Sequence, residues 1–334
     1  PLRFKILASK IPLKNKAIII NKLDDLHSCR LGGSSEIPKY HNWLNSLLKI
    51  PFGKYSELNI NKDSGNIKIA EFLNNSMSTL NKAVYGHTET KDTIIELLAQ
   101  WISNPKSGGN MIALGGSPGT GKTCIIKNGV AKALQRPFIF ISLGGASDAS
   151  YLNGHSFTYE GSTYGKIIDL LIQSQYMNPV IYFDELDKIS ETNKGEEIMN
   201  ILVHLTDIAQ NEHFNDRYFP SIPIDLSRCL FVFSYNDPTK INPILLDRLT
   251  VINVEDFNID DKIKIAQQYL IPEILNTIGI EKDSILFTEE IIKYIIEKYT
   301  CKEAGGVRGL KKCLFKILSK INLLILTQNY ELIN

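Results

Sequence analysis

Short, wholly apolar runs separated by amphipathic segments dominate the middle of the chain. A strand covered on both faces reads as a continuous apolar run, whereas a helix lying on a sheet shows apolar residues at three-to-four spacing. Residues 166–175 and 196–209, between the runs, have that helical spacing. The pattern therefore predicts an α/β core with a five-stranded parallel sheet. The predicted strands are Met111–Leu114, Phe138–Ser142, Val180–Phe183, Leu230–Phe233 and Val251–Val254.

The pattern changes on both sides of this core. Residues 1–75 carry helical spacing interrupted by turns that contain glycine and proline, and residues 255–334 show only successive helical stripes. We therefore expect a helical entry segment at 1–75, the α/β core at 76–254 and a small helical domain at 255–334. The stripes of the last part suit either partner-binding faces or a core of its own, and the second reading is favoured.

Composition and charge narrow the class of protein. The chain has 334 residues, which suits two or three domains, and its 43% hydrophobic and 22% charged residues are globular values. Lys and Arg total 37 against 36 for Asp and Glu, so a strongly basic nucleic-acid-binding protein is excluded, although a local basic patch is not. No apolar run approaches the roughly 18 residues that cross a bilayer. The five cysteines form no C-x-x-C pair and indicate reduced thiols. Because the chain begins with Pro1, we expect a fragment or a processed product.

A phosphate-binding loop provides the clearest chemical signal, because one segment matches G-x-x-x-x-G-K-[ST] in full. Glycines let backbone N–H groups turn toward a phosphate, the lysine supplies a charge for the β- and γ-phosphates, and the final hydroxyl ligates Mg²⁺. The segment lies between a predicted strand and a predicted helix, as this motif requires. Its residues are Gly116, Ser117, Pro118, Gly119, Thr120, Gly121, Lys122 and Thr123.

An acidic pair, Asp184 and Glu185, ends the third apolar run. Asp184 is suited to hold the Mg²⁺ shell through water. Glu185 is suited to polarise an attacking water, which favours hydrolysis over transfer to a second substrate. Carboxylates at a helix start are also a common structural arrangement. The phosphate loop upstream favours the catalytic interpretation.

Three further polar residues lie where the pattern predicts the edge of a site. Asn236 follows the fourth run and could orient the attacking water, or it could form an Asx turn before Pro238. Arg248 precedes the last strand and could reach the γ-phosphate of a neighbouring subunit, or pair with Asp247. Arg308 begins a predicted helix of the last domain and could close that domain onto the nucleotide.

The ordered set of motifs resembles the AAA+ ATPases and, more narrowly, the ATPase module of the Lon proteases. The resemblance covers roughly residues 30–325 and implies an AAA+ P-loop NTPase fold, with a parallel five-stranded sheet sandwiched by helices and a small all-helical lid domain. It also implies ATP and Mg²⁺ as cofactors. The stretches that carry it, besides the phosphate loop, are Asn42–Leu44, Pro51–Ser56, Val84–His87, Ile141–Gly145, Asn153–His155, Thr158–Gly161, Phe183–Lys188, Phe214–Tyr218, Asp225–Ser227 and Glu303–Arg308.

The resemblance implies roles for matching positions. Tyr85 and Gly86 would border the adenine, and Tyr159 with Glu160 would form a pore loop whose aromatic ring grips polypeptide. It further implies that Asn236 is the first sensor, Arg248 a finger acting in trans and Arg308 the second sensor. Two features depart from the family. Glu160 stands where a small aliphatic residue is usual, and the stretch from Thr300 to Arg308 is longer than the common pattern.

These observations lead to one main hypothesis and one alternative. The chain is expected to be the ATPase motor of a Lon-like protease, forming a hexameric ring that threads unfolded or damaged proteins toward a peptidase domain outside these residues. The alternative is a non-proteolytic remodelling protein or nucleotide switch of the clamp-loader type. A phosphoryl-transfer kinase is disfavoured by Glu185. Nucleic acid is a possible partner that the charge does not indicate, no membrane is expected, and the expected compartment is the cytoplasm or, alternatively, the mitochondrial matrix.

Overall fold

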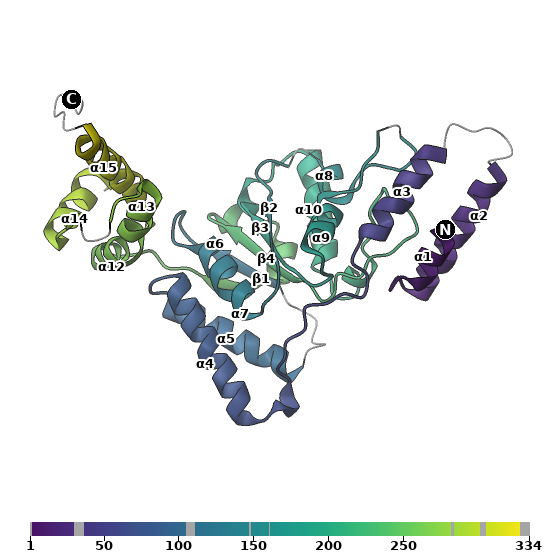
Figure 1. The fold of residues 1–334 in the computed structure, drawn as a ribbon, viewed down its shortest axis with the longest axis horizontal. Helices are drawn as coiled ribbons and strands as arrows, with labels where there is room; N and C mark the ends of the chain where they lie inside the picture. Colours follow the sequence, from purple (N-terminus) through teal and green to yellow (C-terminus); the bar gives the residue numbers. More distant parts are fainter. Residues whose placement is uncertain are drawn as a thin grey trace.

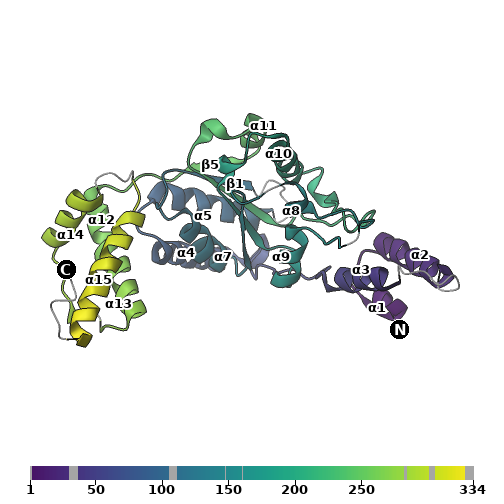
Figure 2. The same ribbon diagram turned by 90° about the horizontal axis from the view of Figure 1, so that it is seen from above.

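Three groups of elements follow one another along the chain in a computed structural model. Helices α1–α3 lie at one end, an α/β core occupies the middle and a helical lid lies at the other end (Figures 1 and 2). The structure describes residues 2–29, 37–104, 111–146, 148–159, 161–281, 284–300 and 305–327. Within these ranges no helix is both long and apolar enough to span a membrane.

The core is built on a five-stranded parallel sheet, as the apolar runs predict. The order of the strands is β2-β3-β4-β1-β5. The predicted fold class, a five-stranded parallel sheet with helices on both faces and a helical lid, is confirmed. The strand bounds are β1 Met111–Gly115, β2 Phe138–Ser142, β3 Val180–Asp184, β4 Leu230–Tyr235 and β5 Thr250–Asn253.

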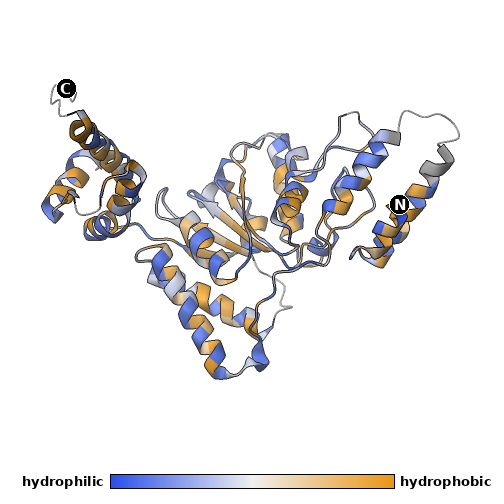
Figure 3. Ribbon diagram, viewed as in Figure 1, coloured by the Kyte–Doolittle hydropathy of each residue, from blue (hydrophilic) through white to orange (hydrophobic). Residues whose placement is uncertain are grey.

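Alternate residues of each central strand enter two separate apolar cores. In β1, Met111 and Ala113 belong to one core, whereas Ile112 and Leu114 belong to the other. This two-sided burial explains why the strands read as continuous apolar runs, and Figure 3 shows the strands mostly in the hydrophobic colour. The first core is covered by α8 (Ser150–Asn153), α9 (Lys166–Ser174), α10 (Asn193–Leu205) and α11 (Pro243–Asp247).

The second core is covered by α4, α5 and a helical run that follows the phosphate loop. That run comprises α6 (Lys122–Cys124), the π-helical η3 (Ile125–Val130) and α7 (Ala131–Ala133). The predicted boundary between residues 75 and 76 falls inside α4 (Asn66–Ala83), which packs against η3 and α5 (Thr88–Ser103). The chain therefore enters the α/β layer before residue 75.

The entry helices α1 (Leu2–Ala8), α2 (Leu13–Cys29) and α3 (Ile37–Lys49) pack onto the first core through residues such as Trp43, which is 2% exposed. The helix predicted at 196–209 ends earlier, because α10 stops at Leu205 and the Asp207 carboxylate accepts a hydrogen bond from the Ala209 N–H at 2.9 Å. Short 3-10 turns lie at Lys62–Ser64, Leu186–Lys188, Asn211–His213 and Pro238–Lys240.

The lid packs its helices around an apolar core of its own, which confirms the favoured reading of the C-terminal stripes. Ile274, Ile292 and Leu314 are among its fully buried members. The elements are α12 (Ile259–Ile265), η7 (Ala266–Leu270), α13 (Ile271–Ile278), α14 (Glu289–Ile295), η9 (Ile296–Thr300) and α15 (Arg308–Thr327).

Candidate nucleotide-binding site

The carboxyl ends of β1, β3 and β4 lie side by side, because β4 pairs with both β1 and β3. The phosphate loop follows β1, Asp184 ends β3, and Asn236 follows β4. In open parallel sheets this edge is where ligands bind. Three segments that are far apart in the sequence thus bring their polar groups to one place.

The phosphate loop uses glycine where a side chain has no room. The φ of Gly116 is +147°, and a Cβ there would lie 2.3 Å from the carbonyl oxygen of Val254. At Gly119 φ is +84°, and a Cβ would lie 3.0 Å from the Cβ of Arg308. The loop is therefore held between the end of β5 and the start of the lid helix α15. Its glycines satisfy a packing demand as well as leaving the backbone open to a phosphate.

Lys122 is the best-connected cation of the site. Its Nζ donates to the carbonyl oxygens of Gly116 at 2.5 Å and Ser117 at 3.1 Å, and to the Oδ1 of Asn236 at 3.0 Å. Burial lowers the pKa of Lys122, while the Asp184 carboxylate nearby acts in the opposite direction. The ammonium group is hydrogen-bonded to neutral carbonyl oxygens, and a phosphate bound here would give it a charge-assisted hydrogen bond.

A hydroxyl network joins the two predicted metal-holding residues. Thr123 Oγ1 donates to the hydroxyl of Tyr182 at 3.2 Å, and Ser234 donates to Asp184 Oδ1. Burial raises the pKa of Tyr182 to about 12, so this hydroxyl stays protonated at neutral pH. The Tyr182 hydroxyl also bonds with Ser234. The network fixes the hydroxyl of Thr123 and the carboxylate of Asp184 on the same side of the sheet edge.

Glu185 lies just beyond Asp184 in a left-handed conformation, with φ of +61°. Its side chain is exposed, and a Cβ added to Gly144 would lie 2.5 Å from its Oε2. The carboxylate therefore rests against the loop that follows β2. A carboxylate in open contact with solvent at this edge can accept a proton from water.

The sequence leaves two roles open for Asn236, an Asx turn and a contact with the site, and in the structure Asp237 and Asn236 take one role each. The Asx turn is made by Asp237, whose Oδ1 accepts from the Thr239 N–H at 3.0 Å. The amide oxygen of Asn236 instead accepts the bond from Lys122. The carboxamide of Asn236 consequently faces the phosphate loop.

The lid contacts the phosphate loop directly. The Val307 N–H donates to the Gly119 carbonyl oxygen at 3.1 Å, and α15 begins at the next residue, Arg308. Arg308 also lies close enough to Lys122 to lower the pKa of that lysine. The predicted lid arginine is therefore near the site, with an exposed side chain.

The segment predicted to border the adenine lies between α4 and α5. Tyr85 packs against the lid core, and Gly86 has φ of +66°. The next residue, His87, bonds through Nε2 with the Thr120 carbonyl oxygen at 2.8 Å, and its ring lies 4.7 Å from that of Phe257. Burial lowers the pKa of His87. This segment thus connects the phosphate loop with the start of the lid.

Other predicted residues lie away from this site within the chain. Arg248 donates to the Val203 carbonyl oxygen at 2.7 Å and pairs with Asp207 at 3.3 Å, so the ion pair with Asp247 considered above is replaced by one with Asp207. Tyr159 is 68% exposed in the loop between α8 and α9. Glu160 lies outside the described residues.

Several residues of the site carry no signal strong enough to be found from the sequence. Tyr182 lies within an apolar run and reads as a core position, and Ser234 directly follows the run Leu230–Phe233 with no motif to mark it. Gly144 and His87 belong to the Lon-like stretches, but their contacts with Glu185 and Thr120 depend on the folded chain. Among the described residues, no group of three or more His, Cys, Asp or Glu could hold a metal ion alone.

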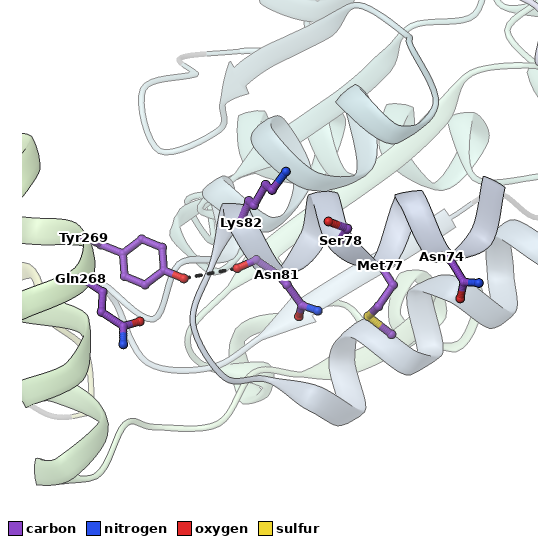
Figure 4. Close-up of a pocket in the computed structure, with 7 residues that line it drawn as sticks. All are labelled: Asn74, Met77, Ser78, Asn81, Lys82, Gln268 and Tyr269. Carbon is purple, nitrogen blue, oxygen red and sulfur yellow. Dashed lines mark hydrogen bonds between the residues drawn. The ribbon is translucent and has the colours of Figure 1, made fainter. Parts of the chain in front are cut away.

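A polar groove between α4 and η7 lies beside the junction of core and lid (Figure 4). Tyr269 donates from its hydroxyl to the Asn81 carbonyl oxygen at 3.3 Å across this junction. None of the predicted phosphate-contacting residues lines the groove. The groove is lined by Asn74, Met77, Ser78, Asn81, Lys82, Gln268 and Tyr269.

Comparison with known families places the fold and the site in one class. Residues 112–256 match the model of the ATPase family associated with various cellular activities (AAA), and residues 276–332 match the Lon protease AAA+ ATPase lid domain. Together with the parallel sheet and the phosphate loop, these matches define an AAA+ P-loop ATPase module.

Similar proteins identify the branch of that class. A "Lon protease homolog" of Acanthamoeba polyphaga mimivirus is 40% identical over 94% of this chain and 32% of its own length. The "Lon protease homolog, mitochondrial" of Saccharomyces cerevisiae is 36% identical over 95% of this chain and 26% of its own, and the "Lon protease" of Chlamydia pneumoniae is 36% identical over 93% and 36%. The chain carries the AAA+ ATPase module of the Lon protease family and spans about a third or less of these relatives.

Proposed function

We propose that this chain hydrolyses ATP to unfold protein substrates and move them through a ring-shaped assembly toward a peptidase domain. The observation that carries the proposal is the meeting of Lys122, Asp184 and Asn236 at one edge of the parallel sheet. A buried lysine, a carboxylate and a glycine-rich loop in this arrangement are the groups that a nucleotide-binding P-loop site uses. The similarity to Lon proteases supports protein as the substrate.

The residues at this edge fit a Mg²⁺ ion that is bound together with a nucleotide. Thr123 and Asp184 would hold it, and this sparse set of oxygen donors suits an ion that keeps several waters and binds phosphate oxygens. When bound, Mg²⁺ supplies positive charge to the phosphate oxygens. Lys122 would bind the β- and γ-phosphates in place of its present carbonyl partners, and Tyr85 and Gly86 would border the adenine.

Hydrolysis would depend on four side chains with different tasks. Glu185 accepts a proton from the attacking water, and Asn236 orients that water from the end of β4. Arg248, which is held on α10 by the Val203 carbonyl oxygen, would act on the nucleotide of a neighbouring subunit. Arg308, at the start of α15, would sense the phosphates through the lid. A closed ring, for which we propose six subunits, brings Arg248 to the neighbouring site.

A Glu185→Gln variant tests the chemical step. Glutamine keeps the shape of the side chain but cannot accept the proton, so ATP binding should persist while turnover falls by about 100-fold or more. Equilibrium ATP binding and steady-state phosphate release measure the two quantities. Turnover equal to that of the wild type would exclude Glu185 as the water-activating residue.

A Tyr159→Ala variant tests the pore assignment. The side chain of Tyr159 is 68% exposed, so its removal should lower unfolding of a folded reporter protein far more than ATP turnover. Unfolding is followed by loss of reporter fluorescence in the presence of ATP. If unfolding continues at the wild-type rate, Tyr159 does not grip the substrate.

A further inference from the structure

The loop that carries Tyr159 contacts a part of the chain outside the ATPase core. Phe157, two residues before Tyr159, has its ring centroid 5.0 Å from that of Tyr40 and 6.2 Å from that of Trp43. Both partners belong to the entry helix α3. Edge-on ring pairs at these distances are favourable and directional. The tip of the loop is thus supported from the N-terminal helices.

Lys39 adds a polar contact to the same loop. Its Nζ donates to the Thr158 carbonyl oxygen at 3.0 Å and lies 4.8 Å from the centroid of the Phe157 ring. Thr158 immediately precedes Tyr159, whose own N–H closes a turn onto the Ser156 carbonyl oxygen at 3.1 Å. One ammonium group therefore contacts both residues that lead into Tyr159.

The helix that makes these contacts is itself firmly anchored. Trp43 is 2% exposed, and its indole N–H donates to the Tyr218 carbonyl oxygen at 2.7 Å. The ring of Tyr218 lies 5.7 Å from that of Phe157, which closes the aromatic cluster. Because Lys39, Tyr40 and Trp43 lie on neighbouring turns of α3, a single helix face contacts the loop on one side.

We propose that α3 positions the Tyr159 loop, with Lys39 and Phe157 as the positioning residues. This inference rests on the proposed function, in which Tyr159 grips the substrate. The ring of Tyr159 is largely exposed. A ring that pulls on a polypeptide must be attached to a backbone segment that is held in a fixed position. The contacts of Lys39 with Thr158 and Phe157 supply that resistance from outside the α/β core.

The test uses Lys39→Met, Lys39→Arg and the control Lys49→Met in the complete protein. Lys49 ends the same helix, is exposed, and makes no hydrogen bond, ion pair or ring contact with the loop among the described residues. Lys39→Met should raise the KM for an unfolded protein substrate, read from substrate-stimulated ATP turnover, by roughly three- to tenfold. Basal ATP turnover should not change. Lys39→Arg should restore the KM because guanidinium keeps both the donor and the ring contact.

Hydrogen exchange and a double variant complete the test. The amides of residues 154–165 should exchange faster in Lys39→Met than in Lys49→Met, while those of α9 should not. In a Tyr159→Ala background, Lys39→Met should add no further change in KM. An unchanged KM in Lys39→Met, or effects of the two variants that simply add, would overturn the positioning role. If Tyr159→Ala alone leaves protein unfolding intact, the pore assignment fails instead.

Discussion

Replacing Gly144 with alanine should slow ATP hydrolysis without weakening the fold. The new Cβ would lie 2.5 Å from Oε2 of Glu185, and its next contact, with the Cβ of Lys188, is an ordinary 3.4 Å. The carboxylate must therefore move by several tenths of an ångström or more. Gly144 is exposed and has no left-handed φ, so alanine is otherwise tolerated at this position.

The expected loss of ATP turnover can be estimated from the effect of displacing a catalytic group by a small distance. Misplacement of a reacting group by about 1 Å can cost on the order of 100-fold in rate, so we expect a fall of about 10- to 100-fold in turnover. The affinity for ATP should change little, because Glu185 is not a predicted phosphate contact. The free energy of unfolding should stay the same or rise by about 0.4–1 kcal/mol, since alanine restricts the unfolded chain.

The neighbouring glycine provides a matched control. A Cβ at Gly145 would meet nothing within 4 Å, so Gly145→Ala makes the same chemical change one residue away from the contact. Phosphate release and ATP binding are measured for both variants, and denaturant unfolding reports their stability. If Gly144→Ala turns over ATP as fast as Gly145→Ala, the carboxylate of Glu185 either does not lie at Gly144 or does not take part in hydrolysis.

Two other predictions concern pH and assembly. Burial raises the pKa of Asp216 to about 7, above its unfolded value, so the stability it contributes is present at low pH and lost as pH rises through the folded pKa. In denaturant unfolding, the free energy of unfolding of the wild type should fall by about 1.4 kcal/mol per pH unit relative to that of Asp216→Ala between pH 5 and about 7, and should not fall further above that range. A wild-type free energy of unfolding that rises with pH relative to the variant would contradict this prediction. For Arg248, we expect that mixing inactive Arg248→Ala subunits with inactive Glu185→Gln subunits restores ATP turnover. In a mixed assembly some sites combine Glu185 of one subunit with Arg248 of its neighbour. If subunit exchange is verified and turnover still does not recover, Arg248 does not act in trans.

The sheet could be predicted from the sequence because its strands are buried on both faces. Each run of apolar residues, such as Val180–Phe183, supplies two cores at once, which is why the run is apolar at every position. The meeting of the phosphate loop, Asp184 and Asn236 followed from strand ends alone. The strand order was not needed for that step, since all parallel strands end at one edge.

Contacts that depend on register or on packing between distant segments could not be predicted in this way. Ser234 bonds with Asp184 only because β3 and β4 pair in the observed register, and nothing local to either residue shows it. Arg248 forms an ion pair with Asp207, which follows α10, and not with Asp247, the residue next to it in the sequence. This pairing results from tertiary packing. The support of Phe157 by Tyr40 joins segments that a sequence pattern treats as separate.

The central claim is that ATP hydrolysis at this site drives work on protein. It is tested most directly by measuring ATP turnover of the assembled protein alone, with saturating unfolded protein and with duplex DNA. We predict that unfolded protein raises ATP turnover, that duplex DNA does not raise it, and that Glu185→Gln abolishes the stimulated turnover. Stimulation by DNA with no response to unfolded protein would contradict the account and favour a nucleotide switch of the clamp-loader type.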